Sequence, residues 1–219
     1  SKLRSLEFFG LGIDDVHEAS YSAAARVSMM DDCGVHAQIV YPNVLGFGGQ
    51  NGKDADEALR IASIEIFNDA MAEMQAESGS RIFPMALIPW WDVKKAVAEV
   101  RRAHGMGLRG ININSDPHLQ GLPPLGDPHW DPLWEACTGL EMPVNFHIGA
   151  SDSAKEWYGT QAWPGGAPDV QFALSSSMIF FSNARVMANI ILSGILDRHP
   201  AIRFVSVESG LGWVPFLLE

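Results

Sequence analysis

The chain has 219 residues, of which 47% are hydrophobic, so it can bury the core of one large domain, and we expect a single domain over residues 1–219. Its formal net charge of -11, with lysines and arginines scattered along the sequence, would repel nucleic acid phosphates and anionic lipids, which excludes nucleic acid as a partner. No stretch approaches the roughly 20 uninterrupted apolar residues of a membrane helix, and the first residues lack the apolar core of a signal peptide, so the sequence predicts a cytoplasmic protein with no membrane contact.

Short β-like runs alternate along the chain with longer helical ones, a pattern typical of repeated β-α units and a parallel sheet. The predicted strands cover residues 35–41, 85–88, 110–114, 144–148 and 204–208. The second strand is expected to begin after Pro84, because proline cannot donate a hydrogen bond to a ladder.

Helical patterns fill the intervals between these strands. The first helix, near residues 21–32, is expected to end at Gly34, and a longer helix or helix pair is expected over residues 170–196. Asp92 and Asp131 each have the character of an N-cap residue at the start of a helix. A stripe of apolar residues that should face the sheet consists of Ile61, Ile64, Phe67, Met71 and Met74.

Two loops rich in glycine, proline, asparagine and tryptophan, residues 43–52 and 151–168, follow the C-terminal ends of predicted strands. In parallel α/β folds, binding and catalysis are located at that end. The first loop is rich in glycine but lacks the lysine and the spacing of a phosphate-binding loop, so it predicts a mobile loop. The Gly-x-Ser-x-Gly sequence of a nucleophile elbow is also missing.

Polar residues interrupt three of the predicted strands, although strands of a parallel sheet are usually apolar on both faces. Alternation of side chains along each strand places the following pairs on one common face: Asn112 and Asn114, Asn145 and His147, and Ser206 and Glu208. If the sheet curls into a barrel, this face becomes the interior. The last member of each pair, Asn114, His147 or Glu208, then lies near the C-terminal mouth.

His147 and Glu208 are therefore candidate metal ligands, and Glu208 is also a candidate catalytic group. Imidazole and carboxylate at neighbouring strand ends can coordinate Zn²⁺ or a similar ion, which polarises a carbonyl or lowers the pKa of bound water toward about 7. Two structural alternatives stay open: His147 can be a hydrogen-bonded core residue, and the interior asparagines can bond one another. We assign no chemistry to the other histidines, which are His17, His36, His104, His118, His129 and His199.

The two cysteines, Cys33 and Cys137, match no metal or redox spacing, and each is expected to be a free thiol. A bridge between them is not expected.

Three stretches of the sequence resemble one known family. They are Asp127-Pro-His-Trp-Asp-Pro-Leu-Trp-Glu-Ala-Cys, Met142-Pro-Val-Asn-Phe-His-Ile-Gly and Leu196-Asp-Arg-His-Pro-Ala-Ile-Arg-Phe-Val-Ser-Val-Glu-Ser-Gly-Leu-Gly-Trp. They are similar to the amidohydrolase-related family that includes aminocarboxymuconate semialdehyde decarboxylase and resorcylate decarboxylase. The likeness extends from about Met30 onward.

The resemblance implies an α/β fold, a TIM-type (β/α)8 barrel with a divalent metal at its mouth, of which this chain holds strands two to six. It matches His147 to the ligand on the fifth barrel strand. Glu208 takes the place where many members have a sixth-strand histidine, and it is either a ligand, an acid/base group or a neighbour of a ligand. The family's His-x-His pair on the first strand and metal-binding Asp on the eighth are not visible, so we expect a part of a longer chain.

The resulting hypothesis is a metal-dependent hydrolase or decarboxylase, with zinc as the expected metal. Its substrate is expected to be a small carboxylated or cyclic organic molecule contacted by Asn43, Trp91 and Asn114. A barrel that lacks three strands exposes two edges and apolar surface, which predicts a homo-oligomer. The alternative is a noncatalytic remnant that acts as an oligomeric or binding module. A doubly wound nucleotide-binding domain is a third interpretation, and the missing phosphate loop argues against it.

Overall fold

The computed structural model describes residues 10–157 and 165–219. Its strands are β1 (Gln38–Val40), β2 (Ile82–Pro84), β3 (Ala86–Leu87), β4 (Ile111–Asn112), β5 (Val144–His147) and β6 (Phe204–Val207). Its α-helices are α2 (Ala23–Asp32), α3 (Glu57–Glu77), α4 (Val93–Gly105), α5 (Asp131–Gly139), α6 (Pro168–Met178), α7 (Phe180–Leu192), α8 (Ile195–Arg198) and α9 (Val214–Leu218). Short 3-10 helices are η1 (Ile13–Asp15), η2 (Glu18–Ser20), η3 (Pro117–Gln120), η4 (Pro128–Trp130) and η5 (Asp152–Trp157).

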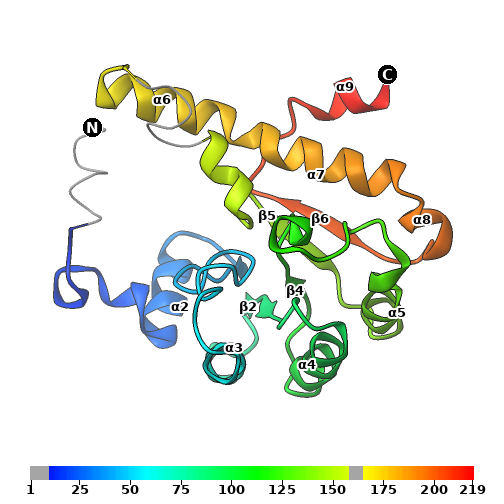
Figure 1. The fold of residues 1–219 in the computed structure, drawn as a ribbon. Helices are drawn as coiled ribbons and strands as arrows, with labels where there is room; N and C mark the ends of the chain where they lie inside the picture. Colours follow the sequence, from blue (N-terminus) through cyan, green and yellow to red (C-terminus); the bar gives the residue numbers. More distant parts are fainter. Residues whose placement is uncertain (1–9, 158–164) are drawn as a thin grey trace.

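The strands are parallel and follow one another in sequence order. β1 pairs with β2, and β3, β4, β5 and β6 form the next ladder in that order. Only Met85 separates β2 from β3, so one segment leaves the first ladder and enters the second. Figure 1 shows α3, α4, α5 and α7 in an arc around the outside of the strands. This arrangement is the predicted β/α barrel, present in part.

Pro84 is the last residue of β2, so strand structure begins before the predicted start, whereas β3, the strand that pairs with β4, does begin after Pro84 as predicted. Pro84 pairs with Val40 in the register of β1 and β2. The Met85 N–H donates to Val40 O at 2.9 Å, whereas the Ala86 N–H donates to Gly110 O at 2.9 Å on the other side. Because backbone N–H groups alternate between the two neighbours of a strand, the nitrogen of Pro84 is on the side of β4. The ladder with β4 begins only at Ala86, so no donor is needed there.

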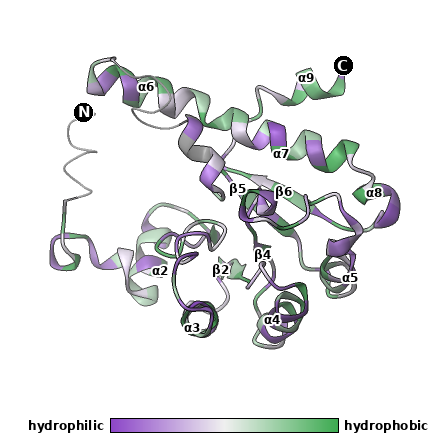
Figure 2. Ribbon diagram, viewed as in Figure 1, coloured by the Kyte–Doolittle hydropathy of each residue, from purple (hydrophilic) through white to green (hydrophobic). Residues whose placement is uncertain are grey.

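The hydrophobic core lies between the outer face of the sheet and the surrounding helices. Strand residues of this face include Ala86, Ile111, Ile113, Val144 and Phe146, all 0% exposed. The α4, α5 and α7 helices cover them with buried side chains, among which are Val100, Trp134 and Val186. Figure 2 shows hydrophobic and hydrophilic residues alternating along α7, as expected for a helix with one buried face.

The inner face of the sheet carries polar side chains, but not all of those predicted. Asn145 lies on it, and its Oδ1 accepts a hydrogen bond from the Tyr41 hydroxyl at 3.3 Å. Ser206 is beside Phe146 in the register of β5 and β6, so it lies on the outer face, where Asn183 of α7 donates to its Oγ at 3.1 Å. The prediction that Ser206 lies on the inner face is therefore wrong, because the alternation of side chains along β6 is offset by one residue. Val207 takes the inner position beside His147.

A buried polar residue of α3 completes the free edge of β3. Asn68 is fully buried; its Nδ2 donates to Leu87 O at 2.8 Å and its Oδ1 accepts from the Leu87 N–H at 2.9 Å. β1 ends at Val40, so the side chain supplies the bonds that a strand would have made. The same Nδ2 donates to Glu99 of α4 at 2.6 Å. The helix stripe predicted from the sequence, which includes the buried Ile64, faces the same way.

Two predicted helix starts have different outcomes. Asp92 caps α4 as predicted, because its side chain accepts from the N–H groups of Lys94 and Lys95. Asp131 is not a cap but the first residue of α5, and its carboxylate instead pairs with Arg198 and His199. The Asp131 carboxylate therefore pairs with charged groups of a later segment and does not cap the helix.

The two cysteines, exposed Cys33 and buried Cys137, are free thiols, as predicted. Burial raises the pKa of the Cys137 thiol to about 12. Within the residues that the structure describes, no helix has the length and apolarity needed to cross a bilayer.

Candidate functional site

His147 is the last residue of β5 and is held at the C-terminal end of the sheet. Its side chain is 5% exposed. Its Nδ1 lies 2.7 Å from Ile148 O, and because a carbonyl oxygen can only accept, Nδ1 carries the proton of this hydrogen bond. In the neutral imidazole the Nε2 atom therefore presents a lone pair away from the backbone. This is the arrangement typical of a metal-ligating histidine.

The carboxylate of Glu208 lies next to the Nε2 lone pair of His147. Alternation along β6 alone would turn Glu208 toward the helices, as it turns Ser206. Glu208 instead follows the strand with a left-handed backbone, φ 53°, which is uncommon for a residue other than glycine. Its Oε2 lies 3.0 Å from His147 Nε2, and its side chain is 66% exposed. The two predicted ligands are thus together, by a backbone turn and not by strand alternation.

The donor set of this pair fits a divalent cation. An imidazole lone pair and a carboxylate oxygen at 3.0 Å face each other as two acceptors, and they need a proton or a cation between them. Zn²⁺ binds nitrogen and oxygen at about 2.0–2.2 Å, so both atoms can touch one ion. Among residues 10–157 and 165–219, no cluster of three or more His, Cys, Asp or Glu side chains is suited to a metal. The described residues therefore provide a pair of candidate ligands and not a complete set.

Aromatic residues fix the plane of the imidazole. Phe47 stacks on His147 with ring centroids 3.9 Å apart and an angle of 10° between the planes. Tyr41 packs edge-on, with centroids 5.3 Å apart. Burial raises the pKa of the Tyr41 hydroxyl, which keeps it protonated as the donor to Asn145. Stacking occupies the ring face and leaves the in-plane lone pair of Nε2 free for a ligand.

Phe47 belongs to the glycine-rich loop 43–52, which is held by contacts with the segments that follow β4 and β5. Gly48 packs so closely on the ends of β4 and β5 that an added Cβ would be 2.6 Å from Ala150 O and 2.8 Å from Asn114 N. Gln50 donates from Nε2 to Gly149 O at 2.7 Å and accepts from the Gly48 N–H at 2.8 Å. The sequence predicted a loop here but gave no signal that Phe47 would reach the histidine.

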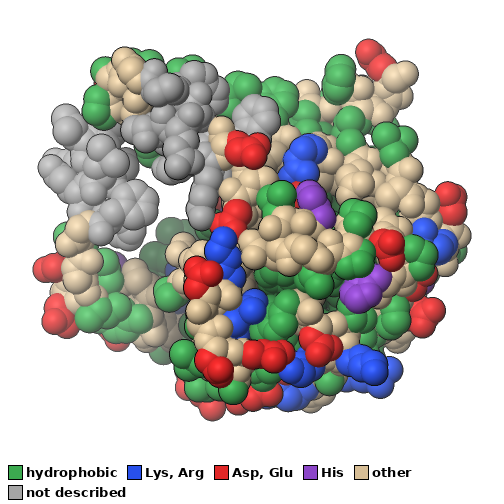
Figure 3. All heavy atoms as spheres, in the orientation of Figure 1, with side chains coloured by type: hydrophobic (Ala, Val, Ile, Leu, Met, Phe, Trp, Pro, Cys, Tyr) green, Lys and Arg blue, Asp and Glu red, His purple; other side chains and the backbone are tan. Residues whose placement is uncertain are grey.

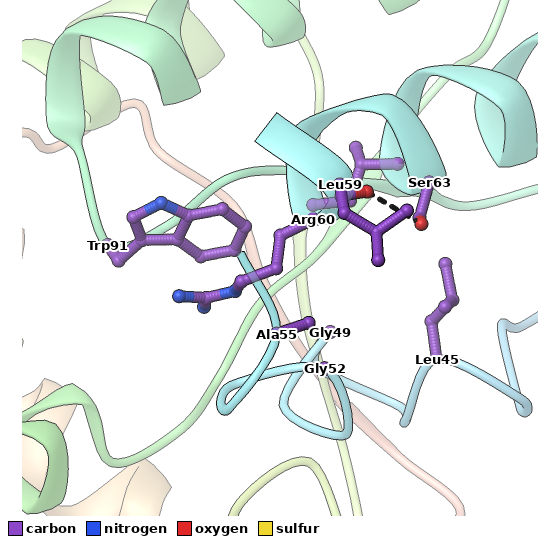
Figure 4. A pocket seen from close by; sticks show the side chains of 9 residues that line it. Leu45, Gly49, Gly52, Ala55, Leu59, Arg60, Ser63 and Trp91 are labelled. Carbon is purple, nitrogen blue, oxygen red and sulfur yellow. Dashed lines mark hydrogen bonds between the residues drawn. The ribbon is translucent and has the colours of Figure 1, made fainter. Parts of the chain in front are cut away.

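The predicted substrate residues Asn43, Asn114 and Trp91 do not form one group. Asn114 is 2% exposed, lies beneath the loop and accepts a hydrogen bond from the Asp116 N–H at 2.8 Å. Asn43 is exposed at the start of the loop. Trp91 lies beyond the loop, where Leu45 and Gly49 line a pocket with it (Figure 4). The loop therefore separates Trp91 from the mouth that holds His147.

The interior asparagines do not bond one another, so that alternative is wrong. Asn145 donates to Ile111 O at 2.9 Å and accepts from Tyr41, while Asn114 accepts from the backbone of Asp116. Asn112 is fully buried, and neither atom of its amide has a hydrogen-bond partner among the described residues. A buried amide without a hydrogen-bond partner is costly.

A buried carboxylate organises the neighbouring loop. Asp116 is 1% exposed at its side chain, and its Oδ2 accepts from Ser151 Oγ at 2.5 Å, Ser153 Oγ at 2.6 Å and Arg185 Nη2 at 2.7 Å. Burial raises the pKa of Asp116, but these hydrogen bonds and the Arg185 charge outweigh it, so the pKa lies below its usual value. The cluster ties the segment after β4 to the loop after β5 and to α7. Residues 158–164 of the predicted second loop lie outside the described residues.

The comparisons with known proteins identify the family of this chain. The family model described as Amidohydrolase matches residues 15–219. A 2-keto-4-carboxy-3-hexenedioate hydratase from Sphingobium sp. (strain NBRC 103272 / SYK-6) is 26% identical over 103 residues, which cover 44% of this chain and 30% of that protein.

Several solved structures share the fold. An amidohydrolase from Mycobacterium avium subsp. paratuberculosis K-10 is 24% identical with a TM-score of 0.72, and the match covers 92% of this chain and 52% of that one. A 2,6-dihydroxybenzoate decarboxylase from Rhizobium is 22% identical with a TM-score of 0.59, covering 88% and 57%. A 5-carboxyvanillate decarboxylase from Novosphingobium aromaticivorans DSM 12444, complexed with manganese, is 23% identical with a TM-score of 0.63, covering 88% and 51%. This chain spans about half the length of these proteins.

Proposed function

Since the chain belongs to the amidohydrolase family, we propose that it forms part of a metal-dependent hydrolase or decarboxylase acting on a small carboxylated or cyclic organic substrate. One observation carries this proposal. The His147 lone pair and the Glu208 carboxylate face each other at 3.0 Å at the C-terminal end of a parallel sheet, where β/α barrels hold their active sites.

In this proposal, His147 Nε2 and Glu208 Oε2 are two ligands of a divalent ion. When bound, such an ion polarises a substrate oxygen or lowers the pKa of a bound water. The hydrogen bond to Ile148 O and the stack on Phe47 hold the imidazole in one orientation. Glu208 is mostly exposed, so its second carboxylate oxygen is available to orient a substrate or to accept a proton. We propose zinc as the ion, although the 5-carboxyvanillate decarboxylase structure contains manganese.

The substrate class is supported by the names of the similar proteins. Two of them are decarboxylases of carboxylated aromatic rings, and the hydratase acts on a carboxylated, unsaturated chain. Asn114, which lies beneath loop 43–52, and Asn43, which is exposed at the start of that loop, are proposed to contact such a substrate. We also propose a homo-oligomer.

Substitution of the two ligands tests the proposal. The protein with its natural flanking sequence should retain about one divalent ion per chain after dialysis, as measured by inductively coupled plasma mass spectrometry. We expect His147→Ala to weaken metal binding by at least about a hundredfold while circular dichroism shows an intact fold, because a strand-end ligand contributes more to the site than to the core. His104→Ala, at an exposed position of α4, is the matched control and should bind metal normally.

Glu208→Gln separates the roles left open for the carboxylate. Loss of metal indicates ligation, whereas retained metal with turnover of 2,6-dihydroxybenzoate or 5-carboxyvanillate reduced by about a hundredfold indicates proton transfer. Normal metal content with normal turnover would show that Glu208 is structural. A metal-free protein whose stability does not respond to added zinc or manganese would favour the noncatalytic binding module instead.

A further inference from the structure

A second pocket lies on the far side of loop 43–52 from His147. Its volume is about 140 Å³, and its walls are the apolar side chains of Leu45, Leu59 and Ile64. Arg60 and Trp91 close one end, and Figure 4 shows the Arg60 side chain lying against the Trp91 indole, opposite Leu45. Leu45 and Gly49 face this pocket, whereas Phe47 and Gly48 contact the mouth. The pocket is therefore separate from the candidate metal site.

Arg60 is a cation whose guanidinium is held in place by stacking and has no ion-pair partner among the described residues. Its guanidinium carbon is 3.4 Å from the centroid of the Trp91 ring, a stacked cation–π contact that fixes the plane of the group. No ion pair links Arg60 to any residue that the structure describes, and its buried Nε has no hydrogen-bond partner there. Burial lowers the pKa of Arg60, the direction expected for a cation removed from water.

The charges of Glu57 and Asp54 raise the pKa of Arg60 and so partly offset its burial, but neither carboxylate forms an ion pair with it. Glu57 pairs with Lys95 Nζ at 2.6 Å, and Asp56 accepts from the first N–H groups of α3 as its cap. Asp54 is exposed and forms no ion pair with a described residue. An anion in the pocket would give the guanidinium the counter-charge that no described residue supplies at ion-pair distance.

The size and polarity of the pocket limit what that anion can be. A cavity of about 150 Å³ lined by apolar side chains accommodates benzene, so this pocket has room for one six-membered ring. Apolar walls favour a hydrocarbon body, and a stacked guanidinium presents parallel N–H groups that match a carboxylate. A phosphate or sulfate would fit the charge but leave the apolar walls unfilled.

We infer that this pocket binds a monocarboxylate with a body of about one ring, its carboxylate on Arg60 and its ring between Leu45 and Leu59. The site is distinct from the metal site, and it needs neither the metal nor the proposed reaction. Because its ligand would contact the same loop that presents Phe47 to His147, occupancy would restrain that loop.

Titration of the full, metal-free chain with benzoate tests the inference. The probes are the Trp91 indole N–H and the Arg60 Nε–H resonances in ¹H–¹⁵N spectra, assigned with Trp91→Phe and Arg60→Lys. We expect a saturable shift of both signals with benzoate. Benzamide has the same shape without the charge, and acetate has the charge without the ring; each should bind at least about tenfold more weakly.

Variants of the chain fix the location. Arg60→Gln should weaken benzoate binding at least about tenfold, whereas Arg109→Gln should not. Arg109 is the matched control because its guanidinium also lies over an aromatic ring, that of Phe83, at 5.5 Å. His147→Ala should leave the benzoate affinity unchanged.

Three results would overturn the inference. Equal affinity for benzamide would show that Arg60 does not recognise charge, and this comparison needs no variant. Unchanged binding in a folded Arg60→Gln protein would place the ligand elsewhere. Loss of binding in His147→Ala would assign benzoate to the mouth of the barrel, while the metal measurements on His147 would remain a separate test of the proposed function.

Discussion

At the scale of single residues, the candidate site depends on how two strand ends place their side chains. Glu208 reaches His147 only because its backbone is left-handed, and the residue two positions earlier, Ser206, points to the opposite side of the sheet. Strained conformations of non-glycine residues persist where the surrounding structure holds them, often at functional sites. The position of Glu208 is therefore consistent with a ligand role and is unusual for a residue that merely ends a strand.

The buried carboxylate of Asp116 leads to a prediction about how stability depends on pH. Its pKa is lowered in the folded chain, so it stabilises the fold above the usual Asp pKa of about 3.9, and this contribution is lost as the pH falls through the lower folded value. Asp116→Asn should reduce the free energy of unfolding at pH 7 by roughly 1–3 kcal/mol. The difference from the natural chain should shrink below about pH 4 in urea unfolding curves.

The exposed Asp32 provides the control for Asp116, because Asp32→Asn removes a carboxylate of α2 at the surface. It should change the free energy of unfolding by less than about 0.5 kcal/mol at every pH. A difference for Asp116→Asn that does not vary with pH would contradict the role of its charge and leave only a packing effect.

At the scale of elements, loop 43–52 connects two otherwise separate regions. Its glycines permit close packing on the ends of β4 and β5, and this contact places Phe47 over His147. The loop lacks regular secondary structure, so its position is set by Gln50, which bonds Gly149, and by Lys53, which pairs with Asp152 at 2.7 Å. Such tertiary contacts have no signature in local sequence.

Gly48→Ala should disturb the site through this loop. The added Cβ would be 2.6 Å from Ala150 O, a backbone atom that cannot turn aside, so the loop must shift and carry Phe47 with it. A displacement of about 1 Å at a catalytic group can lower turnover by about a hundredfold, and we expect a loss of that order in the metal-loaded full-length protein. Steady-state kinetics with a carboxylated aromatic substrate measure it.

Gly52→Ala is the matched control within the same loop. Its added Cβ would meet only Arg60 Cγ at 3.8 Å, which is an ordinary contact. Near-normal turnover is expected for this variant. If Gly48→Ala is equally active, the stack of Phe47 on His147 does not depend on this close approach.

At the scale of the whole molecule, the sheet has two free edges and the surface has apolar areas. β1 and β6 are the outer strands, and the inward-facing Ile39 and Val205 are 61% and 37% exposed. Hydrophobic side chains also lie open over α6, α7 and α9 (Figure 3). Among them Leu192 is 84% exposed, and Phe216 and Leu218 are each 80% exposed. Exposed edges and apolar patches favour association with another chain.

We therefore predict that these 219 residues self-associate with increasing concentration, as sedimentation velocity would show. Ile39→Lys should shift the distribution toward the monomer, because a lysine on an edge strand opposes pairing. Ile66→Lys, on the outer side of α3 where Ile66 is 69% exposed, should leave it unchanged. A natural chain that stays monomeric at all concentrations would contradict the predicted oligomer.

The sequence alone determined the order of strands and helices, because hydrophobic period and capping are local properties that survive in any context. It also placed His147 at a strand end, where the apolar alternation of β5 leaves one polar face. Alternation also named Glu208 as a candidate, and the family resemblance added the partial barrel. Apart from Glu208, these predictions concern residues whose neighbours along the chain set their position.

Only the tertiary structure decided which side chains meet. The register of β5 and β6 turned Ser206 outward, and a left-handed turn brought Glu208 back to His147. Asp131 pairs with His199 and does not cap α5. The stack of Arg60 on Trp91, on separate elements, depends on how α3 packs beside the loop after β3. Contacts between distant segments are set by the packing of the whole sheet and its helices, and that packing is not encoded in any local pattern.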